Sequence, residues 1–263
     1  MAAAAAVVCV TGAGGFIGSW IVKLLLARGY AEEIIEPVIT GTLNVVEVAA
    51  DAGVRRVVLS STIGTMYMDP RRDPDSPLDD SCWSDLDYCK NTKNWYCYAK
   101  TIAERKAWEV ARGRGVDMAV VIPVVVLGEL LQPGMNTSTK HILKYLTGEA
   151  KTYVNESHAY VHVVDAAEAH VRLCSVAQFL AIAECQLVRC RDEINPPKKG
   201  YKFTNQPLKD LGIKFTPVHE YLYEAVKSLE DKGFIKKTSN TKELHRQSSP
   251  PQNSPASMLI SKL

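Results

Sequence analysis

The stretch Thr11-Gly12-Ala13-Gly14-Gly15-Phe16-Ile17-Gly18 decides the expected fold. It stands between a small apolar segment, residues 4–10, that fits a buried strand, and residues 19–28, which show helical periodicity. In such a turn Gly12 allows the tight bend, Gly15 lets the backbone approach a pyrophosphate, and Gly18 lets the helix pack on the strand. The helix N-terminus would add free N–H groups for phosphate. Because strand and helix flank the glycines, the pattern predicts a dinucleotide-binding architecture.

Strands and helices are expected to alternate through the rest of the chain, which predicts a parallel α/β sheet. Strands are expected at residues 56–60, a buried β-branched run, and at 118–126 and 159–164. Helices are expected at residues 37–51 ending before Gly53, 95–111 ending at Gly113, 137–146, 165–173 and 217–232. Residues 68–81, rich in Asp and Pro, predict a loop, and residues 236–263 predict a disordered tail.

Composition is that of a soluble globular protein, with 263 residues, 46% hydrophobic and 23% charged. A net charge of +2 does not favour nucleic acid or an anionic membrane as the partner. The longest apolar runs, residues 120–127 and 54–59, are too short for a membrane span. Residues 1–10 lack the basic start of a signal peptide, so we expect a cytoplasmic location.

The seven cysteines are odd in number and form no CxxC, which disfavours both a disulfide framework and a zinc site. We therefore expect reduced thiols, several of them buried, and no carboxylate cluster indicates another metal. Cys89 and Cys97 flank the motif described next, and their pairing depends on geometry and redox conditions that the sequence leaves open.

Tyr96 and Lys100 form a Tyr-x-x-x-Lys motif at the start of the predicted helix 95–111. A spacing of four places both side chains on one helix face. A lysine cation there favours the phenolate and is expected to lower the tyrosine pKa, which tunes the phenol to protonate a carbonyl oxygen. The hydroxyl-rich strand end Ser60-Ser61-Thr62 could hydrogen-bond the same oxygen. The alternative is a solvated helix face.

Together these features resemble the extended short-chain dehydrogenases/reductases, and one run narrows the resemblance. Lys93-Asn94-Trp95-Tyr96-Cys97-Tyr98-Ala99-Lys100 is similar to the signature of plant cinnamoyl-CoA reductases, which usually have glycine where Ala99 stands. Further matching stretches lie at residues 80–85, 141–146, 159–163 and 201–205, and the likeness covers most of residues 5–235. Dihydroflavonol reductases share the fold and the Tyr/Lys pair.

The resemblance implies a reaction in which NADPH reduces a hydroxycinnamoyl-CoA thioester to a cinnamaldehyde, a lignin precursor. Thr62, Tyr96 and Lys100 would be catalytic, with threonine at a position where the family usually has serine. Lys100 would also hold the nicotinamide ribose. The cofactor contacts would come from Gly12, Gly15, Phe16, Ile17, Gly18, Lys100 and Pro123. His141 and Lys144 would bind coenzyme A phosphates; without the resemblance they would be a solvated helix face.

The resemblance also shows a missing block, because Gly29 is followed almost at once by Glu36-Pro37-Val38-Ile39-Thr40-Gly41. The absent part would hold three strands and the basic residues that recognise the 2′-phosphate of NADPH. A smaller gap is expected between Leu173 and Asp192. The expected fold is a Rossmann-like doubly wound parallel sheet lacking several strands, with a small substrate lobe. Residues 1–128 and 159–175 would form the truncated dinucleotide-binding domain, and residues 129–158 and 176–235 the lobe.

Three functional hypotheses follow. The first is an NADPH-dependent cinnamoyl-CoA reductase. The second is a truncated, catalytically impaired homologue that does not bind NADPH, since removing strands exposes sheet edges and folded proteins have only about 5–15 kcal/mol to spare. The third is a carbonyl reductase like the dihydroflavonol reductases. The sequence does not decide the oligomeric state or the preferred hydroxycinnamoyl group.

Overall fold

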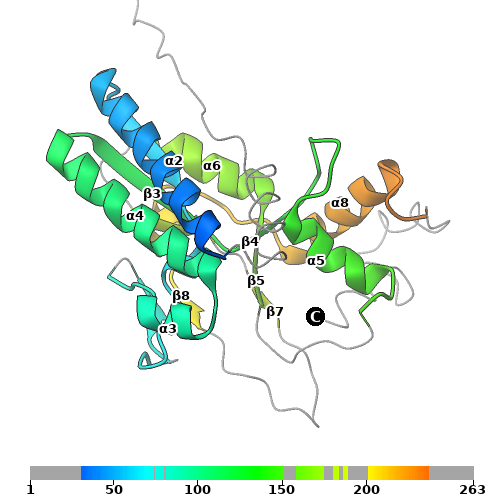
Figure 1. The fold of residues 1–263 in the computed structure, drawn as a ribbon. Coiled ribbons are helices and arrows are strands. Elements are labelled where there is room, and N and C mark those ends of the chain that lie inside the picture. Colours follow the sequence, from blue (N-terminus) through cyan, green and yellow to red (C-terminus); the bar gives the residue numbers. More distant parts are fainter. Residues whose placement is uncertain are drawn as a thin grey trace, which may run out of the picture.

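The computed structural model describes residues 31–73, 75–79, 81–150, 158–174, 180–183, 186–188 and 201–236 (Figure 1). The predictions for residues 4–28, including the glycine loop, and for the tail from residue 237 lie outside these residues. In the described part, no helix is long and apolar enough to cross a membrane. The same part contains no group of three or more His, Cys, Asp or Glu side chains placed to hold a metal ion.

A parallel three-stranded sheet forms the centre of the described structure, in the order β1 (Arg56–Ser60), β3 (Asp117–Pro123) and β6 (Leu180–Ala183). Strand β3 has neighbours on both sides, and its residues 118–122 are fully buried. Its side chains alternate between two hydrophobic clusters, with Ala119 and Val121 in one and the intervening residues in the other. This alternation requires a cover on each face of the sheet.

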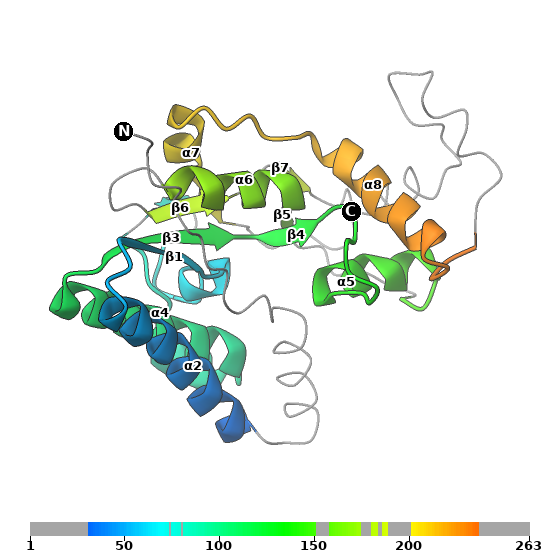
Figure 2. The same cartoon turned by 90° about the horizontal axis from the view of Figure 1, so that it is seen from above.

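Helices supply that cover on both faces, as Figure 2 shows. Helices α2 (Ala31–Asp51) and α4 (Trp95–Arg114) lie together on one face, and α6 (Val163–Leu173) and α7 (Gln206–Asp210) lie on the other. This is the doubly wound arrangement that the sequence predicted. A parallel strand followed by a helix and another parallel strand needs this layering, because each crossover passes over a face of the sheet.

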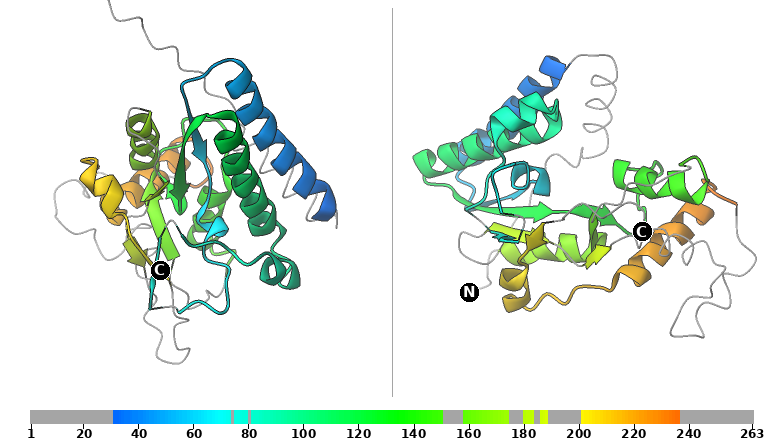
Figure 3. Two further views of the ribbon diagram at one scale, coloured as in Figure 1. Left: turned by 90° about the vertical axis from the view of Figure 1, so that its left-hand side faces the viewer. Right: turned by 90° about the horizontal axis from the view of Figure 1, so that it is seen from below.

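A second sheet continues from the first, because β3 is followed after one residue by β4 (Val125–Leu127). Strand β4 pairs in parallel with β5 (His158–His162), which pairs antiparallel with β7 (Gln186–Val188). Helices α5 (Thr137–Leu146) and α8 (Val218–Asp231) lie beside this sheet, away from α2 (Figure 3). Their shared core contains the following buried residues: Leu127, Ile142, Tyr160, Tyr221, Leu222 and Ala225.

The remaining elements are short and belong to the segments before α4 and α7. They are the 3-10 helix η1 (Ile63–Thr65), helix α3 (Leu86–Asn91), and strands β2 (Pro77–Leu78) and β8 (Lys202–Phe203), which pair in parallel. Leu78 is completely buried, so this small sheet closes one end of the core beneath α4.

Buried polar contacts fix α8 and the segment before it to the base of α6. Asp165, in the first turn of α6, accepts hydrogen bonds from the Thr216 backbone N–H at 2.7 Å and from its hydroxyl at 3.0 Å. His162 lies 2.9 Å from the Glu224 carboxylate, and its ring stacks on Tyr221. His162 and Asp165 therefore join α6 to α8 and to the segment before it.

The observed boundaries correct four sequence predictions. Helix α2 begins at Ala31 and contains Pro37, because a proline in the early turns costs one backbone hydrogen bond without ending a helix that packs along α4. Helix α4 runs to Arg114, and Gly115 caps it at φ 68°, a conformation that glycine adopts readily. The strand expected at residues 118–126 is divided at Val124. Strand β1 is only partly buried, since one strand pairs with it in the described sheet.

Candidate active site

Thr62 lies directly after the carboxyl end of β1, where the chain turns into η1. The Ser61 N–H still donates to the Val121 carbonyl at 2.8 Å, and after this bond the chain leaves the sheet. Thr62 is the N-cap of η1, and its hydroxyl accepts from the Gly64 N–H at 3.3 Å. A Cβ at Gly64 would lie 2.8 Å from the Cys97 sulfur, so glycine permits the close approach of this turn to α4. A hydroxyl is thus held in place at the carboxyl end of a parallel strand, where ligands bind in sheets of this kind.

Helix α4 brings Tyr96 to this hydroxyl. Asn94 caps the helix by accepting from the Cys97 N–H at 3.2 Å, so Tyr96 lies in the first turn. The side chains of Thr62 and Tyr96 are hydrogen-bonded, although the Tyr96 residue remains 43% exposed. The structure therefore brings together two of the predicted catalytic residues, one from a strand end and one from a helix.

The pKa of Tyr96 differs in direction from the sequence prediction. The protein around the hydroxyl raises this pKa, and the hydrogen bond with Thr62 only partly offsets the effect of burial. The expected lowering by Lys100 was wrong, because the ammonium is directed to the Ser60 carbonyl oxygen, to which Nζ donates at 3.4 Å. A raised pKa keeps the phenol protonated near neutral pH, which is the state that a proton donor needs.

Lys100 lies one helical turn beyond Tyr96 and is partly buried. Burial lowers its pKa, and the negative charge of Glu104 raises it again. Glu104 is a buried charged residue of this site that sequence reasoning missed. It is 2% exposed and accepts a hydrogen bond from the Ser61 hydroxyl. The signal was present, because Glu104 follows Lys100 at the same spacing of four that places Tyr96 and Lys100 on one face.

The predicted cofactor residues fall into two groups. Gly12, Gly15, Phe16, Ile17 and Gly18 lie outside the described residues, so their role stays a prediction. Pro123 is the last residue of β3, the strand that pairs with β1, and it is partly buried. Pro123 ends β3, and Thr62 follows the end of β1. Because these neighbouring strands are parallel, both residues lie at the same edge of the sheet, as a shared site requires.

His141 and Lys144 lie together on α5, but only one of them is suited to be a cation. The His141 ring contacts the rings of Tyr145 and His158, each with a centroid separation of 5.5 Å. Burial, aided by Lys144 and His158, lowers the pKa of His141 to about 4. His141 is thus neutral near pH 7 and can only hydrogen-bond a phosphate, whereas Lys144 supplies the charge. We name the rings of His141, Tyr145, His158 and Tyr160 the histidine–tyrosine cluster.

Cys89 and Cys97 are both buried free thiols beside the catalytic helix, as the sequence predicted for several cysteines. They share a small cluster with Met68, and Cys97 lies 4.0 Å from the Tyr67 hydroxyl. Burial raises the pKa of Cys97 to about 11 and raises that of Cys89 as well. Both are therefore protonated near neutral pH and are weak nucleophiles.

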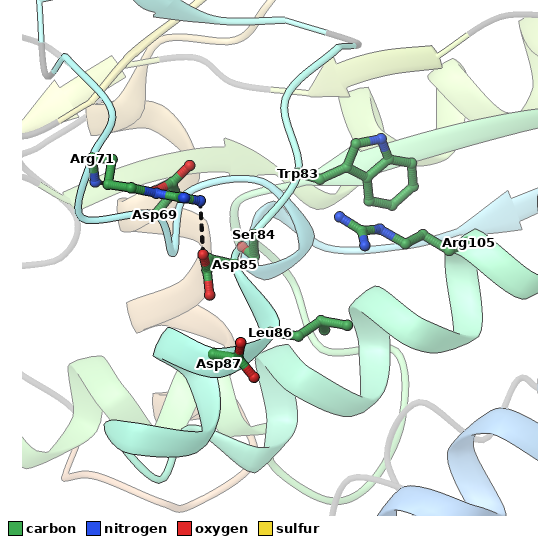
Figure 4. Close-up of a pocket in the computed structure, with 8 residues that line it drawn as sticks. All are labelled: Asp69, Arg71, Trp83, Ser84, Asp85, Leu86, Asp87 and Arg105. Atoms are coloured by element: carbon green, nitrogen blue, oxygen red, sulfur yellow. Dashed lines mark hydrogen bonds and ion pairs between the residues drawn. The ribbon is translucent and has the colours of Figure 1, made fainter.

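A surface pocket of about 250 Å³ lies beside this region, on the outer side of α3 and α4 (Figure 4). Arg105 lies over the Trp83 ring at 5.0 Å, and Arg71 pairs with Asp85 at 2.8 Å. The buried Ser84 hydroxyl donates to the Gly64 carbonyl at 2.9 Å and so supports the turn that carries Thr62. Thr62, Tyr96 and Lys100 do not line the pocket, which distinguishes it from the candidate active site.

Comparison with known proteins places this geometry in a family. The model of the "NAD dependent epimerase/dehydratase family" matches residues 30–179. Cinnamoyl-CoA reductase 2 of Medicago truncatula is 44% identical, with 87% of this chain and 92% of that protein covered. Cinnamoyl-CoA reductase 1 of Arabidopsis thaliana is 43% identical, with 87% and 90% covered. Both alignments extend over 310 positions, more than the 263 residues of this chain, so a segment of each relative has no counterpart here.

Solved structures show the same fold. Vestitone reductase from alfalfa has a TM-score of 0.69 at 21% identity, covering 77% of this chain and 74% of that one. The yeast reductase Gre2, solved with NADPH, has a TM-score of 0.64 at 21% identity, covering 77% and 72%. Fold, family model and curated relatives agree, and the chain therefore belongs to the NAD dependent epimerase/dehydratase family and, within it, is a homologue of the cinnamoyl-CoA reductases.

Proposed function

We propose that the chain is an NADPH-dependent reductase of hydroxycinnamoyl-CoA thioesters, which it converts to hydroxycinnamaldehydes with release of coenzyme A. The observation that carries the proposal is the contact between the Thr62 and Tyr96 side chains at the carboxyl end of β1, with Lys100 one turn along α4. The names of the curated relatives support the substrate class. The NADPH-bound Gre2 structure supports the cofactor.

The residues present fit the nicotinamide side of the cofactor. Lys100 offers an ammonium beside the Ser60 carbonyl, where ribose hydroxyls could bind, and Pro123 ends the neighbouring strand. When bound, NADPH would supply the hydride. The protein's own part is to hold the thioester carbonyl oxygen between Thr62 and Tyr96, so that two hydroxyl donors meet the charge that develops there.

Tyr96 then transfers its proton to this oxygen as hydride reaches the thioester carbon, which gives a thiohemiacetal. Collapse of the thiohemiacetal re-forms the carbonyl and breaks the C–S bond, and coenzyme A leaves as its thiol. One hydride and one proton thus account for the two hydrogens gained. The hydrogen bond from Thr62 stabilises the tyrosinate left behind, consistent with its lowering effect on the Tyr96 pKa.

The phosphate end of the thioester would lie near α5. Lys144 contributes the positive charge, and neutral His141 contributes a hydrogen bond from its imidazole. This division of roles predicts that the two residues contribute unequally to the binding of coenzyme A.

A second candidate function is supported by a different observation. The segment of the relatives without a counterpart here favours a homologue that keeps the catalytic side chains but does not bind NADPH. The sequence places this gap where the adenosine half of the cofactor would be held, between Gly29 and Glu36. Such a chain could still bind coenzyme A esters.

The experiment that separates the two candidates is calorimetric titration of the purified chain with NADPH, followed by a reductase assay with feruloyl-CoA. NADPH binding together with coniferaldehyde formation, identified by mass spectrometry, would support the reductase. Absence of NADPH binding by a chain that melts cooperatively would overturn it in favour of the second candidate. Tyr96→Phe serves as the control for background reduction.

A further inference from the structure

The buried carboxylate of Glu104 is placed between the two flanks of Thr62. Ser61, which precedes Thr62, donates its hydroxyl to Glu104. Thr65, which follows the turn, donates both its N–H and its hydroxyl to the Thr62 carbonyl, each at 3.0 Å, and its side chain lies beside Glu104. Thr62 therefore lies in a turn that closes on itself through Thr65 and is attached to α4 through Ser61.

The same carboxylate belongs to a row of side chains along α4. Tyr96, Lys100, Glu104 and Trp108 follow one another at intervals of four, so they share one helix face. Trp108 is hydrogen-bonded to Glu104, and the charges of Glu104 and Lys100 attract each other. Since Lys100 itself donates to the Ser60 carbonyl, α4 contacts residues 60, 61 and 65 from adjacent turns.

The partners of Glu104 indicate its charge state. An ionised carboxylate only accepts hydrogen bonds, and the Ser61 hydroxyl and the Trp108 indole N–H can both donate to it. A buried charge is tolerated when such donors and an opposite charge surround it. Burial raises the pKa of Glu104, while these donors and Lys100 lower it again.

We propose that Glu104 is a positioning residue, whose buried carboxylate holds the end of β1 before Thr62 against α4, one helical turn beyond Lys100. The inference deepens the proposed function, because it takes from that proposal the roles of Thr62, Tyr96 and Lys100. Glu104 acts through these three residues and does not itself touch the substrate. The effects of Glu104 can nevertheless be measured in the protein without substrate or cofactor.

The test is Glu104→Gln, which keeps the shape of the side chain and removes its charge. The matched control is Glu109→Gln, a charge removal at an exposed position of the same helix. Both variants and the unchanged chain are labelled with [ε-¹³C]lysine, and the Lys100 resonance is assigned with Lys100→Arg. We expect the pKa of Lys100 to fall further in Glu104→Gln, because the nearby negative charge is lost, and to stay unchanged in Glu109→Gln. Amide exchange at Thr65 and Met66 should become faster only in Glu104→Gln.

A Lys100 pKa that is the same in both variants and the unchanged chain would overturn the proposal, since a merely structural role would lower the melting temperature without changing this titration. If Glu104→Gln does not fold, the unchanged chain still provides the test. Its Lys100 resonance must show a second, smaller inflection at acid pH where Glu104 takes up a proton, and the absence of that inflection overturns the proposal. None of these measurements requires NADPH, so failure of the proposed function would be seen separately.

Discussion

The turn after β1 and the histidine–tyrosine cluster are both rich in polar groups, but these groups have different kinds of partner in the two regions. At the turn, the Glu104 carboxylate receives a hydrogen bond from Ser61 and lies beside the Trp108 indole, and Lys100 has a carbonyl partner. In the cluster, rings meet rings, and the completely buried Tyr160 hydroxyl has no hydrogen-bond partner among the described residues.

This difference sets the charge state at each place. Hydrogen-bond donors and Lys100 lower the pKa of the Glu104 carboxyl and so partly offset the rise that burial causes. Imidazole and phenol rings around a histidine remove water without replacing its hydrogen bonds, so His141 becomes neutral. The turn is therefore suited to proton transfer by Tyr96 beside Lys100. The cluster is suited to packing, and Lys144 at its edge is the cation that it offers.

The largest expected effect concerns the turn. Tyr96→Phe removes the proton donor and should lower kcat for feruloyl-CoA by about 10²–10⁴-fold, the usual contribution of general acid catalysis. Tyr98→Phe, a half-buried tyrosine of the same helix, should retain the activity. The NADPH oxidation rate and the melting temperature of each variant are the measurements. Equal loss of activity in both variants would contradict the role of Tyr96.

The next effect tests how firmly α8 is held beside the cluster. Asp165→Ala leaves the Thr216 N–H and hydroxyl without this acceptor and should lower the free energy of unfolding by about 3 kcal/mol. Glu168→Ala, which removes a half-exposed ion pair with Arg172, should cost less than about 1 kcal/mol. Urea unfolding followed by circular dichroism measures both. Equal losses in the free energy of unfolding would show that the buried contact at Asp165 stabilises the fold no more than an exposed ion pair does.

The charge state of His141 predicts a pH dependence. Its pKa of about 4 in the folded chain lies below the ordinary value of 6.5, so between these values the unfolded chain binds more protons. Stability should therefore fall as the pH is lowered from 6.5 to 4, and His141→Gln should flatten that part of the profile. His219→Gln, an exposed histidine on α8, is the control. A profile unchanged by His141→Gln would show that His141 titrates normally.

The smallest expected effect is a gain in stability. Tyr160→Phe removes a buried hydroxyl without breaking any hydrogen bond among the described residues, and it should raise the free energy of unfolding by about 1 kcal/mol. Tyr98→Phe should change it by less than about 0.5 kcal/mol. Thermal unfolding measures both variants. A loss of stability in Tyr160→Phe would show that this hydroxyl has a partner, such as an ordered water, and would weaken the contrast between the two regions.

Much of the fold could be predicted because local patterns repeat with the periods of helices and strands. The strand at residues 56–60 and the helix at residues 137–146 were predicted with their observed bounds. The start of α2 was wrong, because packing along α4 extends the helix through Pro37. The division of the strand at residues 118–126 was missed, since a continuous apolar run carries no signal for a change of sheet.

The sequence by itself determined the family, the parallel α/β class and the placement of Tyr96 and Lys100 one turn apart on one helix, because spacing along a helix fixes which side chains share a face. It also brought Thr62 into the candidate site, through the hydroxyl-rich strand end Ser60-Ser61-Thr62 and the resemblance to the family. Only the tertiary structure decided the electrostatics. Tyr96 has a raised pKa, His141 is neutral, and Glu104 lies between the flanks of Thr62. These properties depend on desolvation and on partners from distant parts of the chain, which no local pattern specifies.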